Sequence, residues 1–146
     1  MIKRQSGKIK RWSKVFLSNF AIVESGIFFN QPIVEEIMNV ETTQMKRCTI
    51  VKTSGRIDGS NAPILAQALK GITSKGVYNI VFDMSEITFV ASAGWWVLID
   101  TQKTCKTSGE LVLVNVDKGI KDSLNLVGMG SYFRTFDDVT TAVGDF

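Results

Sequence analysis

Two short apolar runs constrain the fold of this chain more than any other feature of its sequence. They are YNIVFD at 78–83 and ELVLVN at 110–115, and neither alternates with polar residues as a strand with one wet face would. Runs of this kind are typical of strands in a sheet that helices cover on both faces. Apolar residues at helical spacing lie between and around the two runs, so the sequence predicts an α/β domain.

The remaining elements follow from turn residues and from helix caps. Ser60 or Asn61 is expected to cap the first helix, with Pro63 in its first turn. Gly109 is expected to close the second helix as its C′ residue. The expected strands cover 38–43, 47–54, 78–83, 110–115 and, weakly, 134–136, and the expected helices cover 61–75, 93–108, 117–127 and 137–143.

The positive charge of the chain is concentrated at its N-terminal end. Of the 146 residues, 1–37 hold six Lys or Arg against three acids, whereas the remainder holds eleven of each sign. A near-neutral domain over 38–146 gives no reason to expect a nucleic-acid partner. Residues 1–37 are expected to be a disordered extension or a misassigned start. Any membrane contact would be made through their basic, amphipathic pattern.

Metal sites and histidine-based catalysis lack the residues that they need. The sequence has no histidine, and its two cysteines, Cys48 and Cys105, are far apart without metal-site spacing. We therefore expect no metal, no cofactor and a reducing, cytoplasmic location.

The stretch FVASAGWWVLI at 89–99 reads as a strand that stops at Ser92 and restarts as a helix. A nucleophile elbow would need glycine where Val90 stands and a histidine base, and a Ser-x-x-Lys pair is excluded by Trp95. A serine without a base is a weak nucleophile. The pattern therefore favours a protein that is not an enzyme, with no catalytic residue. Chemistry on carboxylates stays open for three positions: Asp58, Asp83 and Glu86.

Two interpretations of Ser92 are consistent with its place at a helix start. Its side chain could cap the helix, which is worth about 1 kcal/mol. It could instead accept a phosphate, because free N–H groups and the helix dipole favour an anion there. Position alone favours the cap.

Several segments in order resemble the STAS domain, the fold of bacterial anti-sigma factor antagonists, over Met38–Phe146. They are SGRID (54–58), VFDMSEITFVASAGWWVLI (81–99), SGELVLVNV (108–116) and SLNLVGMGSYFRTFDD (123–138). The resemblance implies a mixed sheet of four to five strands with about four helices, in the order β-β-α-β-α-β-α-(β)-α. It implies Ser92 as the phosphoacceptor and Asp58 as a partner-binding residue. The family's usual acid before that serine is replaced by Ala91.

The resemblance also implies a function by partner switching. The unphosphorylated domain would bind an anti-sigma factor of the ATP-binding serine-kinase type. Phosphorylation of Ser92 would release it, and a PP2C-type phosphatase would reset the switch. The loss of the acid at Ala91 keeps an alternative open: an accessory or scaffold subunit, beside a lipid-transport ATPase or in a sensory complex, without a phosphorylation switch.

The two tryptophans after the bend complete the expected partner surface. A helix from Ala93 would turn the stripe of Gly94, Val97, Leu98, Thr101 and Cys105 inward. Trp96 would then be exposed as an apolar anchor, with Trp95 at its flank on the edge of the core. The expected partner-binding residues are Asp58, Ala91, Ser92, Ala93, Gly94, Trp95 and Trp96.

Overall fold

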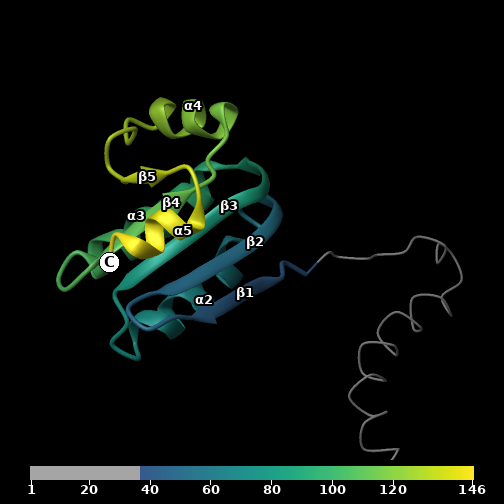
Figure 1. Cartoon of the computed structure of the whole chain (residues 1–146). Coiled ribbons are helices and arrows are strands. Elements are labelled where there is room, and N and C mark those ends of the chain that lie inside the picture. Colours follow the sequence, from purple (N-terminus) through teal and green to yellow (C-terminus); the bar gives the residue numbers. More distant parts are fainter. Residues whose placement is uncertain (1–36) are drawn as a thin grey trace, which may run out of the picture. The chain divides into compact units, whose positions relative to one another are not determined.

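The computed structural model of the chain describes residues 37–146 (Figure 1). Its elements follow the order β-β-α-β-α-β-α-β-α, which confirms the predicted order. They are β1 (Val40–Gln44), β2 (Thr49–Ile57), α2 (Ala62–Thr73), β3 (Asn79–Val90), α3 (Ser92–Cys105), β4 (Glu110–Val114), α4 (Lys118–Leu126), β5 (Thr135–Phe136) and α5 (Val139–Gly144).

A mixed five-stranded sheet in the order β1-β2-β3-β4-β5 forms the centre of the fold. The short turn after β1 makes β1 antiparallel to β2, whereas the helical connections make β2, β3, β4 and β5 parallel to one another. Residues 111–114 of β4 are all buried, as expected for an apolar strand covered on both faces.

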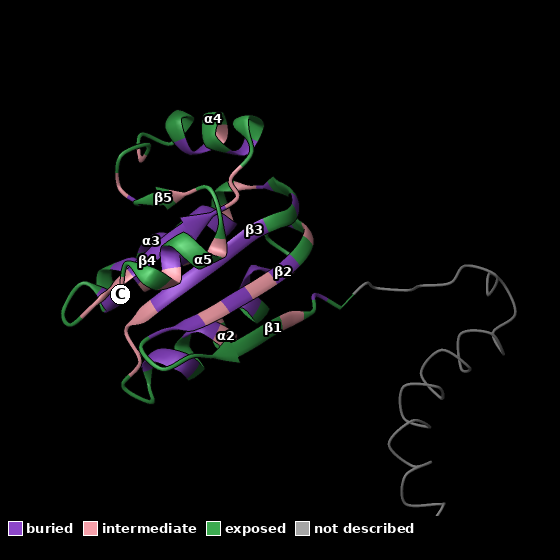
Figure 2. Cartoon of the chain, in the orientation of Figure 1, coloured by how far each residue is buried: buried purple, intermediate pink, exposed green. Residues whose placement is uncertain are grey.

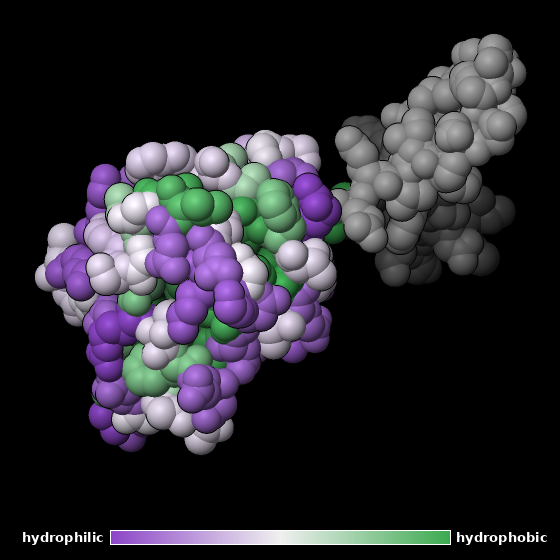
Figure 3. Space-filling view, turned by 90° about the horizontal axis from the view of Figure 1, so that it is seen from above, coloured by the Kyte–Doolittle hydropathy of each residue, from purple (hydrophilic) through white to green (hydrophobic). Residues whose placement is uncertain are grey.

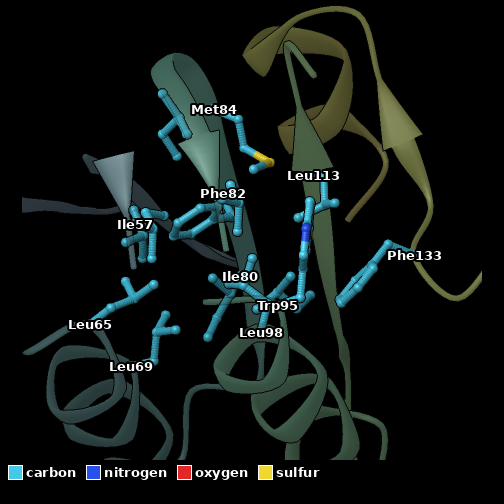
Figure 4. Packing of buried hydrophobic residues seen from close by; sticks show 14 of the residues in the cluster. Ile57, Leu65, Leu69, Ile80, Phe82, Met84, Trp95, Leu98, Leu113 and Phe133 are labelled. Carbon is cyan, nitrogen blue, oxygen red and sulfur yellow. The ribbon is translucent and has the colours of Figure 1, made fainter. Parts of the chain in front are cut away.

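Two apolar cores lie on opposite faces of the sheet. Helices cover both faces, and buried residues are concentrated in the central strands (Figures 1 and 2). Helices α2, α3 and α4 supply the larger core, which contains Leu65, Leu98 and Leu124 with the strand residues Ile80 and Phe82 (Figure 4). Helix α5 covers the other face, where its Ala142 packs with the smaller core of Cys48, Val81, Val112 and Val114. Burial raises the pKa of the Cys48 thiol, and it raises the pKa of the Cys105 thiol to about 11.

Strands β2 and β3 run further than the apolar pattern predicts. β2 continues to Ile57 because Gly55, at φ 85°, accommodates a bulge inside the strand instead of starting a loop. β3 continues from the expected end at 83 to Val90, with two shifts of register against β2. Exposed residues such as Glu86 and Phe89 interrupt the apolar run there and hide the strand.

Helix α3 ends earlier than predicted, and Gly109 has another role. The helix ends at Cys105, and its C-cap is Lys106. A Cβ at Gly109 would lie 2.6 Å from the carbonyl oxygen of Tyr78. Glycine is therefore needed there for close backbone packing at the start of β4 and not to close the helix.

The expected N-terminal extension, 1–37, lies outside the described residues except for Ile37, which is exposed. The amphipathic pattern in that extension lies outside them too. Between residues 37 and 146, no helix has both the length and the apolar character that crossing a bilayer requires.

Candidate functional site

The bend between β3 and α3 lies beside the end of β2. Parallel pairing places Ile57 opposite Val90, so the two strands end at the same edge of the sheet. The backbone N–H of Ala91 donates a hydrogen bond to the Ile57 carbonyl at 2.8 Å. The turn that starts at Asp58 and the bend that contains Ser92 are therefore neighbours.

Ser92 is the first residue of α3, and its side chain is exposed. The N-cap position belongs to Ala91, in extended conformation, which has no side-chain oxygen to cap the helix. The interpretation of Ser92 as the helix cap is therefore wrong, because the helix begins one residue earlier than predicted. What remains at Ser92 is an accessible hydroxyl at a helix N-terminus, where the backbone favours negative charge.

Gly94 is buried under the bend and holds it close to the strands. A Cβ at this position would lie 2.6 Å from Cγ2 of Ile57 and 2.9 Å from Cγ1 of Val90. Both of these side chains are β-branched and buried, so they have little freedom to move aside. Gly94 therefore allows α3 to pack closely against Ile57 and Val90, and it is too buried to contact a partner.

Gly94→Ala is expected to lower the free energy of unfolding by about 1–3 kcal/mol, because it overpacks the contact with Ile57 and Val90. Chemical denaturation of the variant measures this loss. Gly71→Ala in α2 is the matched control, since nothing lies within 4 Å of its new methyl group. That control should be stabilised by up to about 1 kcal/mol through helix propensity. Equal behaviour of the two variants would contradict the close packing at Gly94.

Asp58 provides a fixed negative charge next to the bend. Its Oδ1 accepts hydrogen bonds from the backbone N–H of Ser60 at 3.0 Å and from its hydroxyl at 2.6 Å. These bonds, the hydroxyl bond foremost, lower the pKa of Asp58. Asn61 closes the turn, accepting from the Asp58 N–H and donating to the Arg56 carbonyl. Asp58 is thus ionised and held in place, partly exposed, where a partner could contact it.

Asp83 and Glu86, the other two candidates for carboxylate chemistry, both bind structural partners. Asp83 is buried and accepts hydrogen bonds from the backbone of Ser85 and from the side chain of Asn115. Glu86 forms an ion pair with Lys52 at 3.0 Å. Hydrogen bonding to Glu86 raises the pKa of Lys52.

The two tryptophans have opposite environments. Trp96 is 58% exposed, which confirms its predicted place on the wet side of the helix. Trp95 is 1% exposed, so its prediction as a flanking surface residue is wrong. The buried stripe of α3 is Gly94, Trp95, Leu98, Ile99, Gln102 and Cys105, with Val97 and Thr101 only partly buried.

The buried stripe of α3 differs from the predicted one because α3 packs against α4 as well as against the sheet. Trp95 lies in the larger core between the sheet and α4, near Leu98 and Leu113 (Figure 4). Its indole Nε1–H donates to the Ser123 hydroxyl on α4 at 2.9 Å. Because α4 packs on that side of α3, Trp95 is buried, and Val97 lies toward α2.

A surface groove of about 550 Å³ runs between α2 and α3 and includes Trp96. Besides Trp96, its lining residues are small or weakly polar, apart from one charge of each sign. Neither Lys70 nor Asp100 forms an ion pair within residues 37–146. The lining residues are Ala66, Lys70, Thr73, Trp96, Val97, Asp100, Thr101 and Thr104. An exposed indole beside such a groove suits an apolar side chain of a protein partner.

Sequence reasoning missed Arg56 and Phe89, which lie one residue before the neighbouring strand ends. They are opposite each other in the sheet, and the Arg56 guanidinium lies 4.3 Å from the centre of the Phe89 ring. Phe89 is 40% exposed. Ile57 and Val90 point into the larger core. Because successive side chains of a strand point to opposite faces, their neighbours Arg56 and Phe89 lie on the other face of the sheet.

Seen from above, the surface that includes α4 carries hydrophobic and hydrophilic patches side by side (Figure 3). Leu126 at the end of α4 is 88% exposed, and Val127 is 37% exposed.

The family model of the STAS domain matches residues 39–142. The chain belongs to the STAS domain family. This confirms the resemblance and the fold that it implies.

Solved structures with the same fold include both bacterial regulators and part of a mammalian transporter. An anti-sigma factor antagonist from Mycobacterium paratuberculosis is 21% identical with a TM-score of 0.68, over 74% of this chain and 92% of that one. The phosphorylated form of SpoIIAA from Bacillus is 14% identical with a TM-score of 0.59, over 74% and 97%. A murine anion transporter of the solute carrier 26 family is 21% identical with a TM-score of 0.58, over 70% of this chain and 18% of that one. At these identities the likeness shows a shared fold.

Proposed function

We propose that this STAS domain is an anti-sigma factor antagonist that works by partner switching at Ser92. The observation that carries the proposal is the exposed Ser92 hydroxyl at the first residue of α3, beside the fixed carboxylate of Asp58. Structures of anti-sigma factor antagonists share the fold, which supports this role. In the unphosphorylated form, the Ser92 bend, Asp58 and Trp96 bind an anti-sigma factor of the ATP-binding serine-kinase type in the cytoplasm.

The switch is a single phosphoryl transfer carried out by the partner. A bond forms between Ser92 Oγ and the γ-phosphorus of ATP, the bond to the leaving ADP breaks, and the hydroxyl proton passes to a base of the kinase. The product adds about 1.5–2 negative charges at the bend, next to the ionised Asp58. The amides at the helix start stabilise this phosphate, but the interface with the partner loses affinity through repulsion and desolvation. A PP2C-type phosphatase removes the phosphate.

The replacement of the family's acid by Ala91 does not leave the bend without support. The Ala91 N–H donates to Ile57, and the Ala91 carbonyl accepts from the amides of Gly94 and Trp95 at 2.9 and 3.1 Å. Backbone hydrogen bonds thus hold the bend that carries Ser92. This favours a functional phosphoacceptor despite the missing carboxylate.

Phosphate is expected at Ser92 and at no other residue of the bend, because Ala93 offers no hydroxyl. The measurement is incubation of the full chain with the serine-kinase anti-sigma factor from the same genome and ATP, followed by mass-spectrometric mapping. Ser92→Ala should abolish incorporation, and Ser108→Ala, a control at an exposed serine beyond the other end of α3, should retain it. Incorporation that persists in Ser92→Ala would refute the assignment.

The second candidate is an accessory or scaffold subunit without a phosphorylation switch, next to a lipid-transport ATPase or in a sensory complex. The specific observation in its favour is Ala91, which removes the acid that precedes the family's phosphoacceptor. The same experiment separates the two, because this candidate predicts a stable complex without any phosphate on Ser92.

A further inference from the structure

A hydrogen-bond chain runs from the buried indole of Trp95 through α4 to the bend. The Nε1–H of Trp95 donates to Oγ of Ser123 at 2.9 Å, and the Ser123 hydroxyl donates to the carbonyl oxygen of Val90 at 3.4 Å. The Ser123 hydroxyl accepts one hydrogen bond and donates the other, so its proton points toward the Val90 carbonyl. Residues far apart in the sequence thus meet on the strand end that precedes Ser92.

The peptide group between Val90 and Ala91 is consequently held from both sides. Its N–H donates to the Ile57 carbonyl of β2 at 2.8 Å, and its C=O accepts from Ser123 of α4. The next carbonyl, that of Ala91, accepts from the first amides of α3. Only Ala91 lies between this peptide group and Ser92, so the orientation of the group helps to set the direction in which the bend presents the serine.

The indole N–H of Trp95 fixes the orientation of the Ser123 hydroxyl. Trp95 is 1% exposed, so its N–H has no access to bulk water and needs a protein acceptor. Ser123, which is partly buried, supplies that acceptor and is oriented by it. In such a chain each bond polarises the next, and removal of either end disturbs both bonds.

We propose that Trp95 and Ser123 are positioning residues for Ser92: they fix the Val90–Ala91 peptide group and thereby couple the place of α4 to the conformation of the bend. They touch neither the partner nor the phosphoryl group and act through Val90. The proposal deepens the proposed function and rests on it only for the role of Ser92. The coupling itself is a property of the isolated chain.

The experiment is site-resolved amide hydrogen exchange by NMR on the full chain, without partner. Ser123→Ala removes both hydrogen bonds of the chain, whereas Trp95→Phe removes only the bond from the indole to Ser123. Both variants keep most of the packing. The amides of Ala91, Gly94 and Trp95 should exchange about three- to fivefold faster, because the bond from Ser123 to the Val90 carbonyl is long and its loss has a modest effect. The amides of 111–114 in β4, which report global unfolding, should accelerate by a clearly smaller factor than the amides of the bend.

Two controls distinguish positioning from general packing. Trp96→Phe removes an indole N–H from the exposed neighbour and should leave exchange at the bend unchanged. Ser123→Thr keeps the hydroxyl and should restore slow exchange. The double variant Trp95→Phe/Ser123→Ala should be no faster than the more affected single variant, because both belong to one chain.

Equal acceleration at the bend and in β4, or none at the bend, would overturn the proposal and leave Trp95 and Ser123 as core residues only.

A second arm uses the kinase and ATP: Ser123→Ala should lower kcat for Ser92 phosphorylation several-fold with KM unchanged, since the contact surface is intact. An unchanged kcat would also count against positioning. If the unaltered chain takes up no phosphate, the proposed function fails, and the exchange arm still decides the coupling.

Discussion

Trp95→Ala is expected to lower the free energy of unfolding by about 3–5 kcal/mol, the range for a truncated core aromatic. The ring is 1% exposed in the larger core, and its loss leaves a cavity between the sheet and α4. It also leaves the hydroxyl of Ser123 without its donor. Urea denaturation, with the midpoint and the slope both fitted, measures the loss.

The neighbouring tryptophan supplies the control for this result. Trp96→Ala removes the same side chain from a position that is 58% exposed and should cost less than about 1 kcal/mol. Comparable losses from the two variants would show that the helix is turned differently about its axis. A small loss from Trp95→Ala alone would contradict its place in the core.

Trp96→Ala is expected to weaken binding of the anti-sigma partner by about thirtyfold, which corresponds to about 2 kcal/mol. The indole stands next to the α2–α3 groove and is the largest exposed apolar side chain of α3. A titration followed by isothermal calorimetry measures the change. Leu126→Ala, which truncates an apolar residue that is 88% exposed at the end of α4, should bind normally. A normal affinity of Trp96→Ala would remove the groove from the partner surface.

The order of elements could be predicted because it depends on local patterns. The uninterrupted run at 110–115 identifies a buried strand, and Gly and Asn residues mark the turns on either side of α2. Neighbouring ends of β2 and β3 follow from parallel pairing, so the proximity of Asp58 and Ser92 was within reach of the sequence.

The face that α3 turns inward could not be predicted from its own residues. Its hydrophobic pattern is weak, because Trp95 and Trp96 are adjacent and Thr101 and Gln102 are both polar. Gln102 is nevertheless buried, since its Oε1 accepts a hydrogen bond from the Leu111 amide at 2.7 Å. The contacts with β4 and with Ser123 decide the orientation, and these partners lie 9 and 28 residues away.

The extension of β3 to Val90 and the start of α3 at Ser92 have a related cause. A bulged strand breaks the alternation on which strand prediction depends, and β3 shifts its register against β2 twice. The resemblance to the family identified Ser92 all the same, because it rests on residue identities and not on the boundary of the helix.

Partner switching at Ser92 is tested most directly by one titration. The purified serine-kinase anti-sigma factor is titrated with the unmodified chain, with Ser92→Asp and with Ser92→Asn, which has the same size as Asp without its charge. The unmodified chain should bind, Ser92→Asn should bind within a few-fold of it, and Ser92→Asp should be weaker by at least about tenfold, because only Asp places a second negative charge beside Asp58. Equal affinity of Ser92→Asp and the unmodified chain would contradict the switch.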